Sequence, residues 1–297
     1  MTQTSQSRSS LVLVVLITLI WGFNWATMKV VLSEVPPFTF RSLCMASGAI
    51  GLFAIAKFNG LAIRVPPGQW TRLMASALFN ITGWNLLIAF GLKYVAASRG
   101  VILAYTMPMW TVLLSMIFLH ERLTGNRALG LVFGMVAMLI LVSVEFAQLR
   151  AAPLGALLVV GAALSWSIGT IILKRYPVDL PTTSMTGWTM VLGGIPIWIA
   201  TPFFERVSLS NISFWPALGV VYNMLLAVIF CYWAWNKLIS RGSASVTSLS
   251  TLMIPVIGVF SSMWFLGEQP RWQEFSALGL VIISLMLVLM PKWEVSK

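Results

Sequence analysis

Residues that could carry out catalysis or bind a metal are few in this sequence. One histidine and eight Asp and Glu residues occur among 297, and no carboxylate falls near the centre of an apolar block. A metal site needs clustered His, Cys, Asp or Glu ligands, and an enzyme needs a nucleophile beside a base. The two cysteines, Cys44 and Cys231, lie in separate apolar blocks and are interpreted as small buried hydrophobic residues. The sequence therefore predicts no metal, no cofactor and no catalytic residues.

Aromatic side chains inside apolar blocks are the first candidates for binding a small molecule. Trp21 and Trp166 lie about 15–17 Å into their expected helices, at a rise of about 1.5 Å per residue. Most tryptophans of membrane proteins lie instead at the membrane–water interface. A tryptophan near the membrane centre presents a flat apolar wall and an N–H group that needs an acceptor. We expect both rings to line a cavity, with packing between helices as the alternative.

Uncharged polar residues in the same blocks extend this set. Amide and hydroxyl groups can bond to both the carboxylate and the ammonium group of a zwitterion. Each of them alone is also explained by a hydrogen bond between helices, worth about 0.6 kcal/mol on average. The residues that we expect to line a substrate cavity are Trp21, Asn24, Asn80, Trp84, Tyr105, Trp166, Tyr222 and Ser248.

Prolines and arginines in or near the apolar blocks allow two interpretations each. Pro108 and Pro255 remove a backbone hydrogen bond inside an apolar block, which predicts helix kinks that serve either gating or a purely structural bend. Arg41 and Arg99 lie near the starts of expected helices. We interpret them as anchors at the membrane surface, with guidance of a substrate carboxylate at the outer mouth as the alternative.

The elements that must position these residues are membrane-spanning helices. Only 9% of the residues are charged and 59% are hydrophobic, and the mean hydropathy is +0.90. The apolar residues come in blocks of about twenty, the length of a helix that crosses a hydrocarbon core about 30 Å thick. We expect an all-α membrane protein with ten such helices, at residues 11–32, 38–58, 71–92, 95–119, 127–145, 154–175, 182–203, 213–237, 243–266 and 273–291.

The net charge of +11 does not indicate nucleic-acid binding, because the 19 Lys and Arg residues occur singly or in pairs between apolar blocks. Cytoplasmic loops of membrane proteins are enriched in Lys and Arg. We therefore expect both termini, a tail at 1–10 and a tail at 292–297, on the cytoplasmic side of the cell (inner) membrane. This orientation leaves only seven of the 19 basic residues outside, namely Lys29, Arg41, Lys93, Arg99, Arg150, Arg206 and Arg271.

The two halves of the chain carry the same marker residues in the same order. Trp21 and Lys29 match Trp166 and Lys174 at a spacing of 145, and Pro108 and Glu121 match Pro255 and Glu268 at a spacing of 147. Each half holds five expected helices, an odd number, so the second half must lie inverted in the membrane. Inverted repeats place a shared site near the membrane centre and permit alternating access. We expect repeats at 11–145 and 153–291 around a central cavity.

These repeated elements resemble the EamA family of the drug/metabolite transporter superfamily. The resemblance covers about residues 11 to 291 and rests on Trp21-Gly22-Phe23-Asn24-Trp25, on Pro108 followed by Leu119-His120-Glu121-Arg122-Leu123-Thr124, and on Pro255 with Leu266-Gly267-Glu268. Within the family, the many tryptophans suggest the bacterial aromatic amino-acid exporters of the YddG type. The resemblance implies ten helices in two inverted repeats, and export of amino acids or other small metabolites across the cytoplasmic membrane.

Ion coupling through a buried acid is not expected, because no carboxylate is embedded deep in the membrane. In this respect the chain differs from the small multidrug proton antiporters, which resemble half of this fold and rely on a membrane-embedded Glu. Facilitated export or exchange along the gradient of the substrate is the simpler prediction.

Other functions and assemblies remain as alternatives. The transported substrate could be a nucleoside, a sugar phosphate or a drug, although phosphate favours several cations in the cavity. A membrane receptor or structural protein is the alternative outside transport, and it would not need an inverted repeat. The expected partners are the lipid bilayer and a small-molecule substrate, an amino acid, with no nucleic acid. Gly130 and Gly134 form a Gly-x-x-x-Gly pattern that favours close helix packing within a monomer, with a dimer as the alternative.

Overall fold

The described parts of the chain are helices joined by short connections, with no strand among them. The computed structural model describes residues 3–121, 124–147, 152–206, 212–240 and 244–289. The elements are α1 (Gln3–Val31), α2 (Pro37–Phe58), α3 (Trp70–Ala77), η1 (Leu78–Gly83), α4 (Trp84–Tyr94), α5 (Ala97–Ala104), α6 (Met107–Leu119), α7 (Gly125–Ala147), α8 (Ala152–Arg175), α9 (Thr182–Phe204), α10 (Phe214–Tyr222), η2 (Asn223–Phe230), α11 (Cys231–Ser240), α12 (Ala244–Leu266) and α13 (Trp272–Leu289), where η1 and η2 are π-helical.

The outer surface of the bundle is apolar, as a lipid-facing surface must be. Phe203, Trp264 and Ile50 are 81%, 84% and 72% exposed, which water would disfavour and a bilayer does not. Seven described segments are long and apolar enough to cross a membrane: Leu11–Val31, Pro37–Phe58, Trp70–Tyr94, Ala97–Leu119, Leu154–Arg175, Thr182–Phe204 and Phe214–Leu238. In the other three expected spans the described residues form shorter apolar helices, at Ala128–Leu141, Met253–Leu266 and Trp272–Leu287. The chain is a multi-pass helical membrane protein.

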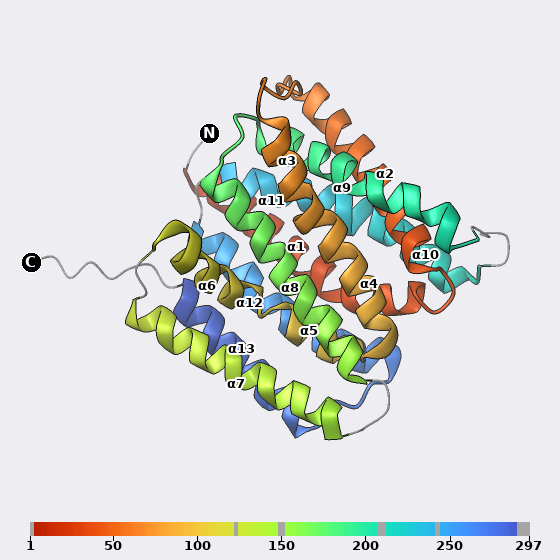
Figure 1. Ribbon diagram of the computed structural model, residues 1–297, viewed down its shortest axis with the longest axis vertical. Coiled ribbons are helices and arrows are strands. Elements are labelled where there is room, and N and C mark those ends of the chain that lie inside the picture. Colours follow the sequence, from red (N-terminus) through yellow and green to blue (C-terminus); the bar gives the residue numbers. More distant parts are fainter. Residues whose placement is uncertain (1–2, 122–123, 148–151, 207–211, 241–243, 290–297) are drawn as a thin grey trace, which may run out of the picture.

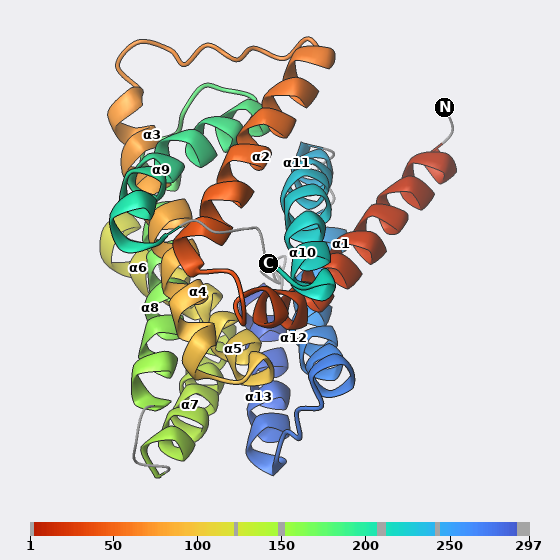
Figure 2. The ribbon, with the colours of Figure 1, turned by 90° about the vertical axis from the view of Figure 1, so that its right-hand side faces the viewer.

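Helix packing pairs elements from the two halves of the chain. α2 packs against α9, and α7 packs against α13, so that corresponding helices of the two halves lie side by side (Figures 1 and 2). α1 packs against α12, while α8 packs against α4, α5 and α6. The described part of α1 begins at Gln3, so most of the polar N-terminal segment that we expected as a tail is helical.

α6 and α12 end in the same turn. His120 and Gly267 both have positive φ, 53° and 64°, and each follows the last residue of its helix. The next residue in each case is a glutamate whose backbone N–H donates to a serine carbonyl six residues earlier, Glu121 to Ser115 and Glu268 to Ser262, both at 3.3 Å. A left-handed residue directly after the last helical residue is a common helix terminator. Glycine adopts this conformation freely and histidine does not.

Substitutions of His120 and Gly267 are expected to change the stability of the protein in opposite directions. His120→Gly removes a side chain from a left-handed position and should stabilise the protein by about 1 kcal/mol. Gly267→Ala should destabilise it by about the same amount, although a Cβ at Gly267 meets no atom within 4 Å. The temperature of unfolding in detergent checks both changes. An increase for Gly267→Ala would show that backbone conformation does not govern these turns.

The span expected at 95–119 consists of two helices. α5 ends at Ala104, and Tyr105 and Thr106 form a turn before α6. Pro108 therefore lies in the first turn of α6, where its missing N–H costs no helical hydrogen bond. The expectation of a proline inside a continuous helix is wrong for Pro108. Pro255 does lie inside the helix α12.

Two further spans contain π-helical segments that the sequence pattern did not predict. η1 begins at Leu78 and η2 begins at Asn223, a spacing of 223 − 78 = 145 residues. The Nδ2 of Asn85 donates to the carbonyl of Ile81 at 2.9 Å, and the Nδ2 of Asn223 donates to the carbonyl of Gly219 at 3.0 Å. Side-chain amides thus satisfy backbone carbonyls where the helical hydrogen-bond pattern changes.

The glycines of the Gly-x-x-x-Gly pattern contact other helices of the same chain. The carbonyl of Gly130 accepts a hydrogen bond from Ser284 Oγ at 2.6 Å. A Cβ at Gly134 would overlap the Sδ of Met109. Both contacts use these glycines for packing within one chain.

Candidate functional site

Two adjoining cavities lie between the helices. The smaller, of about 140 Å³, is lined from α1, α2, α4, α8, η2 and α11 by Trp21, Asn24, Trp25, Met28, Arg41, Met45, Trp84, Asn85, Ile88, Trp166, Asn223, Ala227, Val228 and Tyr232, and by Tyr105 and Met107 at the α5–α6 break. The larger, of about 390 Å³, shares Trp21, Tyr105, Met107, Trp166 and Tyr232 with it. The volume of the larger cavity lies in the usual range of ~300–1,000 Å³ for small-molecule sites.

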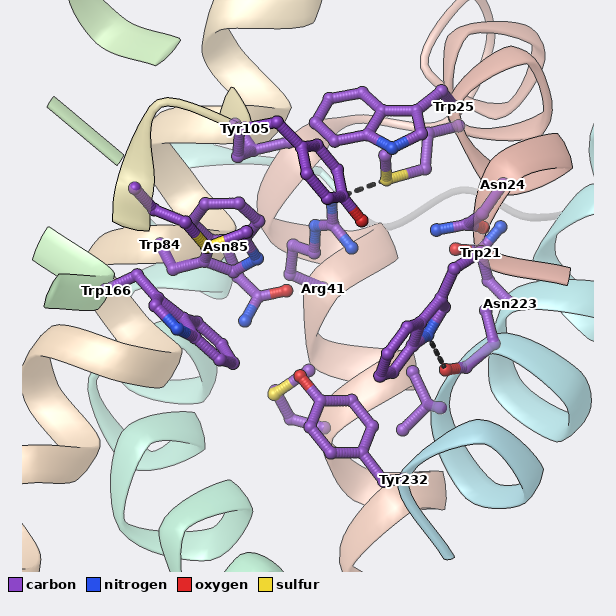
Figure 3. A pocket seen from close by; sticks show the side chains of 16 residues that line it. Trp21, Asn24, Trp25, Arg41, Trp84, Asn85, Tyr105, Trp166, Asn223 and Tyr232 are labelled. Carbon is purple, nitrogen blue, oxygen red and sulfur yellow. Dashed lines mark hydrogen bonds between the residues drawn. The ribbon is translucent and has the colours of Figure 1, made fainter. Parts of the chain in front are cut away.

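Two pairs of aromatic rings lie on the wall of the smaller cavity, and three of these four rings also line the larger one. Trp166 meets Trp84 edge to face at 5.3 Å between ring centroids, and Trp21 meets Tyr232 in the same way at 5.8 Å. Figure 3 shows the two pairs on different sides of the smaller cavity. The indole Nε1 of Trp21 donates to the carbonyl of Ala227 at 2.9 Å, so this partly buried N–H has its acceptor. The walls present flat apolar surfaces to any occupant.

Polar groups on the cavity wall are mainly amides. Asn24, Asn85 and Asn223 come from α1, α4 and η2. The amino groups of Asn85 and Asn223 bond to their own helices, whereas the Oδ1 of Asn24 is buried without a hydrogen-bond partner among the described residues. An unsatisfied buried acceptor is costly unless a water or a ligand donates to it.

One buried cation lies on the wall of the smaller cavity. Arg41, in the second turn of α2, is only 4% exposed. Its guanidinium points toward the middle of the lining side chains (Figure 3). The interpretation of Arg41 as a surface anchor is therefore wrong. Arg99, by contrast, lies close to Glu274 on α13, with 2.5 Å between Nε and Oε1.

The larger cavity extends to one end of the bundle, here called the Glu121 end, where Glu121 and Lys174 lie on its wall. These two side chains form an ion pair with 2.5 Å between Nζ and Oε1, and they are 31% and 51% exposed. The wall of this cavity also carries the hydroxyl groups of Thr111, Ser115 and Thr170. The cavity is thus lined by exposed residues at this end.

The opposite end, here called the Lys29 end, is tied together by charged side chains on helix termini. The Nζ of Lys29 donates to the carbonyls of Leu92 and Val95 at 2.5 and 2.7 Å. Glu268 accepts from the backbone N–H groups of Ala97 and Ser98 at 2.7 and 3.0 Å. Cations at helix C-termini and anions at helix N-termini are both favoured by the helix dipole. These bonds join α1 and α12 to the α4–α5 turn.

Two more carboxylates act in the same way at the Lys29 end. Glu205 accepts from the backbone N–H groups of Phe38 and Thr39 at the start of α2, at 2.9 and 2.7 Å. Glu34 accepts from the backbone N–H of Ser213 at 2.7 Å, just before α10, and this bond lowers the pKa of Glu34. Because Trp25 and Met28 on the nearby cavity wall are also buried, the cavity is closed at this end.

The structure brings together five of the eight residues that we expected at a cavity: Trp21, Asn24, Trp84, Tyr105 and Trp166. Asn80 and Tyr222 instead bond between helices, Asn80 Nδ2 to the carbonyl of Trp166 at 2.6 Å and the Tyr222 hydroxyl to the carbonyl of Ile20 at 2.7 Å. The side chain of Ser248 lies outside the described residues. Pro108 lines the larger cavity, and Pro255 does not appear on either wall.

Sequence reasoning missed Tyr232 and misplaced Arg41. The repeat spacing could have indicated Tyr232. At a spacing of 232 − 85 = 147 residues, Tyr232 corresponds to Asn85, the sequence neighbour of Trp84. The position of Arg41 near a helix start gave no sign that its side chain turns inward.

Comparison with known proteins finds a family match over both halves. The model of the family described as "EamA-like transporter family" matches residues 8–143 and 153–290. The "Uncharacterized transporter YoaV" of Bacillus subtilis is 26% identical over 257 residues, which cover 86% of this chain and 88% of that protein. The "Probable amino-acid metabolite efflux pump" of Escherichia coli is 26% identical over 293 residues, covering 93% of each chain.

A solved crystal structure has the same fold. It superposes with a TM-score of 0.67 at 20% sequence identity and covers 94% of this chain and 96% of its own. At this identity the likeness concerns the fold alone.

Proposed function

Since this chain belongs to the EamA-like transporter family, we propose that it exports or exchanges aromatic and other neutral amino acids across the cell membrane. The observation that carries this proposal is the wall of the smaller cavity, where the described lining residues include six aromatic side chains, three amides and one cation around one space. Aromatic rings suit an apolar side chain, and amides bond to both ends of a zwitterion. Relatives named as amino-acid metabolite efflux pumps occur in Escherichia coli and Salmonella typhimurium.

Transport proceeds by alternating access between two inverted five-helix repeats, with ten membrane spans and both termini in the cytoplasm. The contacts between helix ends support this arrangement. The end of α1 meets the end of α4 at the Lys29 end, while the end of α8 meets the end of α6 at the Glu121 end. Corresponding helices α1 and α8 then run in opposite directions. In this orientation the Glu121 end is cytoplasmic, and the conformation is open to the cytoplasm and closed to the outside.

Substrate contact is assigned to Trp21, Asn24, Trp84, Tyr105 and Trp166, which line the cavities. Asn80 and Tyr222 position the helices that carry these residues. The break before Pro108 and the proline inside α12, Pro255, are the points at which the two halves flex.

Sugar phosphates and nucleosides are the competing substrates. A phosphate group favours several cations, and the two described cavities offer Arg41 in one and Lys174 in the other, the latter paired with Glu121. A nucleoside base could stack on the same aromatic walls, so that competitor has to be tested directly.

Counterflow in proteoliposomes tests the proposal. We expect labelled phenylalanine and tryptophan, and more weakly threonine, to accumulate in vesicles preloaded with the same unlabelled amino acid. A labelled nucleoside should not accumulate. Movement of the nucleoside without movement of any amino acid would refute the assignment of the substrate.

The same vesicles test the driving force. Glu121 is the only carboxylate among the described lining residues of the two cavities, and it is paired with Lys174. We therefore expect the rate of amino-acid exchange to be the same with and without a pH gradient. A strong dependence on the gradient would mean that proton coupling exists.

A further inference from the structure

The guanidinium of Arg41 is buried without a counter-ion from the residues that the structure describes. Its Nη2 lies 3.0 Å from the Sδ of Met28, its Cζ lies 4.7 Å from the ring centroid of Phe40, and the thiol of Cys44 is beside it. These neighbours are uncharged. No carboxylate among the described residues forms an ion pair with Arg41, and its Nε has no hydrogen-bond partner there.

A lone buried cation is expensive for a membrane protein to maintain. Removing a charged group from water costs several kcal/mol unless a partner compensates, and intramembrane arginines normally pair or face a water-filled path. Arg41 is built into the wall of a cavity, so the missing partner can come from a molecule that enters the cavity.

The groups around the cavity indicate what that molecule carries. The planar guanidinium matches a carboxylate through two parallel hydrogen bonds. The unpartnered Oδ1 of Asn24, which lies on the same wall, can accept from an ammonium group. Trp21, Trp166 and Tyr232 line the larger cavity as well as the smaller one, so they offer aromatic surfaces where a side chain has room.

We propose that Arg41 is the carboxylate-binding residue of the transporter, so that a free carboxylate is required of every substrate. This inference rests on the proposed function, since it names how the amino acid is held. Amines, amides and nucleosides that share the aromatic part of a substrate then lack the group that neutralises Arg41. A phosphate is disfavoured at this position, because the rest of the described wall of the smaller cavity adds no second cation.

The test compares ligands that lack either the carboxylate or the ammonium group of tryptophan. Labelled tryptophan counterflow is measured against unlabelled tryptophan, tryptophanamide, tryptamine and indole-3-propionate. In the parent protein, tryptophan should compete roughly 10–100-fold better than tryptophanamide, the value of a charged hydrogen-bond pair. Indole-3-propionate, which keeps the carboxylate and lacks the ammonium group, should compete better than tryptamine.

The same comparison in variants assigns the effect to Arg41. In Arg41→Gln the preference for tryptophan over tryptophanamide should fall to within about 2-fold, and Arg41→Lys should retain an intermediate preference. Arg64 is an exposed cation in the α2–α3 connection. The control variant Arg64→Gln should keep the preference of the parent for tryptophan. Ligand-dependent thermal stabilisation in detergent gives the same ratios for any variant that binds without transporting.

The outcomes separate the two proposals. If the parent transports tryptophan but does not distinguish it from tryptophanamide, or if Arg41→Gln keeps the full preference, the role of Arg41 is wrong and the proposed function stands. If the parent moves tryptamine or a nucleoside and no amino acid, the proposed function itself is wrong. The comparison within the parent needs no variant, so misfolding of Arg41→Gln does not block the test.

Discussion

Replacing Trp166 by alanine is expected to reduce the exchange of aromatic amino acids roughly 10–100-fold while the protein still folds. The ring lines both cavities and forms one wall together with Trp84. A large ring against a substrate contributes roughly 1.5–3 kcal/mol through the apolar area that it covers. The helix stays in place, because Asn80 holds the backbone carbonyl of Trp166 and not its side chain.

The corresponding change on α1 should behave differently. Trp21→Ala removes the same kind of wall, but it also leaves the carbonyl of Ala227 without the indole donor. An unsatisfied buried carbonyl costs about 1–3 kcal/mol, so Trp21→Ala should lower the unfolding temperature in detergent more than Trp166→Ala does.

Two controls frame the measurement on Trp166. Trp166→Phe keeps an aromatic wall and should retain most of the exchange rate. Trp215→Ala removes a tryptophan that is 69% exposed at the start of α10 and should leave exchange unchanged. If Trp166→Ala folds well and exchanges amino acids at the normal rate, the aromatic walls have no role in transport.

The repeat made a large part of this site predictable. Trp21 and Trp166 stand out in the sequence because the same residue recurs at the repeat spacing and at a depth where tryptophan is rare. The helix spans followed from apolar length, which a bilayer imposes on every crossing helix. For these features a local property of the sequence determines the structure.

Other features of the site depend on contacts that a sequence pattern does not contain. The π-helical segments η1 and η2 change which residues face the cavity. The hydrophobic periodicity of the sequence does not predict such segments. Arg41 looks the same in sequence whether its side chain extends to the surface or turns into the bundle. Asn80 and Tyr222 have suitable chemistry but bond to neighbouring backbones, because a polar group in a membrane takes the nearest acceptor.

The second large effect is expected at the closed end. Lys29→Met should open the Lys29 end and increase the labelling of the cavity from that side roughly 100-fold. Lys29 supplies two charged hydrogen bonds to the carbonyls of Leu92 and Val95, each worth about 1.5–3 kcal/mol. Methionine fills similar space without a donor, so both bonds are lost. A change of about 3 kcal/mol in favour of opening shifts a two-state equilibrium by about two orders of magnitude.

A single cysteine near this closure reports the change. The chain has only two cysteines, Cys44 and Cys231, and both are buried, so alanine at both positions gives a background without thiols. Met28→Cys then places a thiol on the cavity wall beside Lys29, at a position that is 4% exposed. A membrane-impermeant maleimide applied from the Lys29 side should react slowly with this protein and much faster once Lys29→Met is added.

The repeat supplies the matched control for this experiment. Lys174 corresponds to Lys29 at a spacing of 174 − 29 = 145 residues, but it lies at the Glu121 end in an exposed pair with Glu121. An exposed ion pair contributes only about 0–1 kcal/mol. Lys174→Met should therefore leave labelling of the cysteine at position 28 as slow as in the parent. Equal acceleration by both substitutions would mean that they loosen the bundle as a whole, and no acceleration by Lys29→Met would mean that other contacts keep this end shut. Only the unequal response fits a carrier whose two ends are held by related lysines and are closed one at a time.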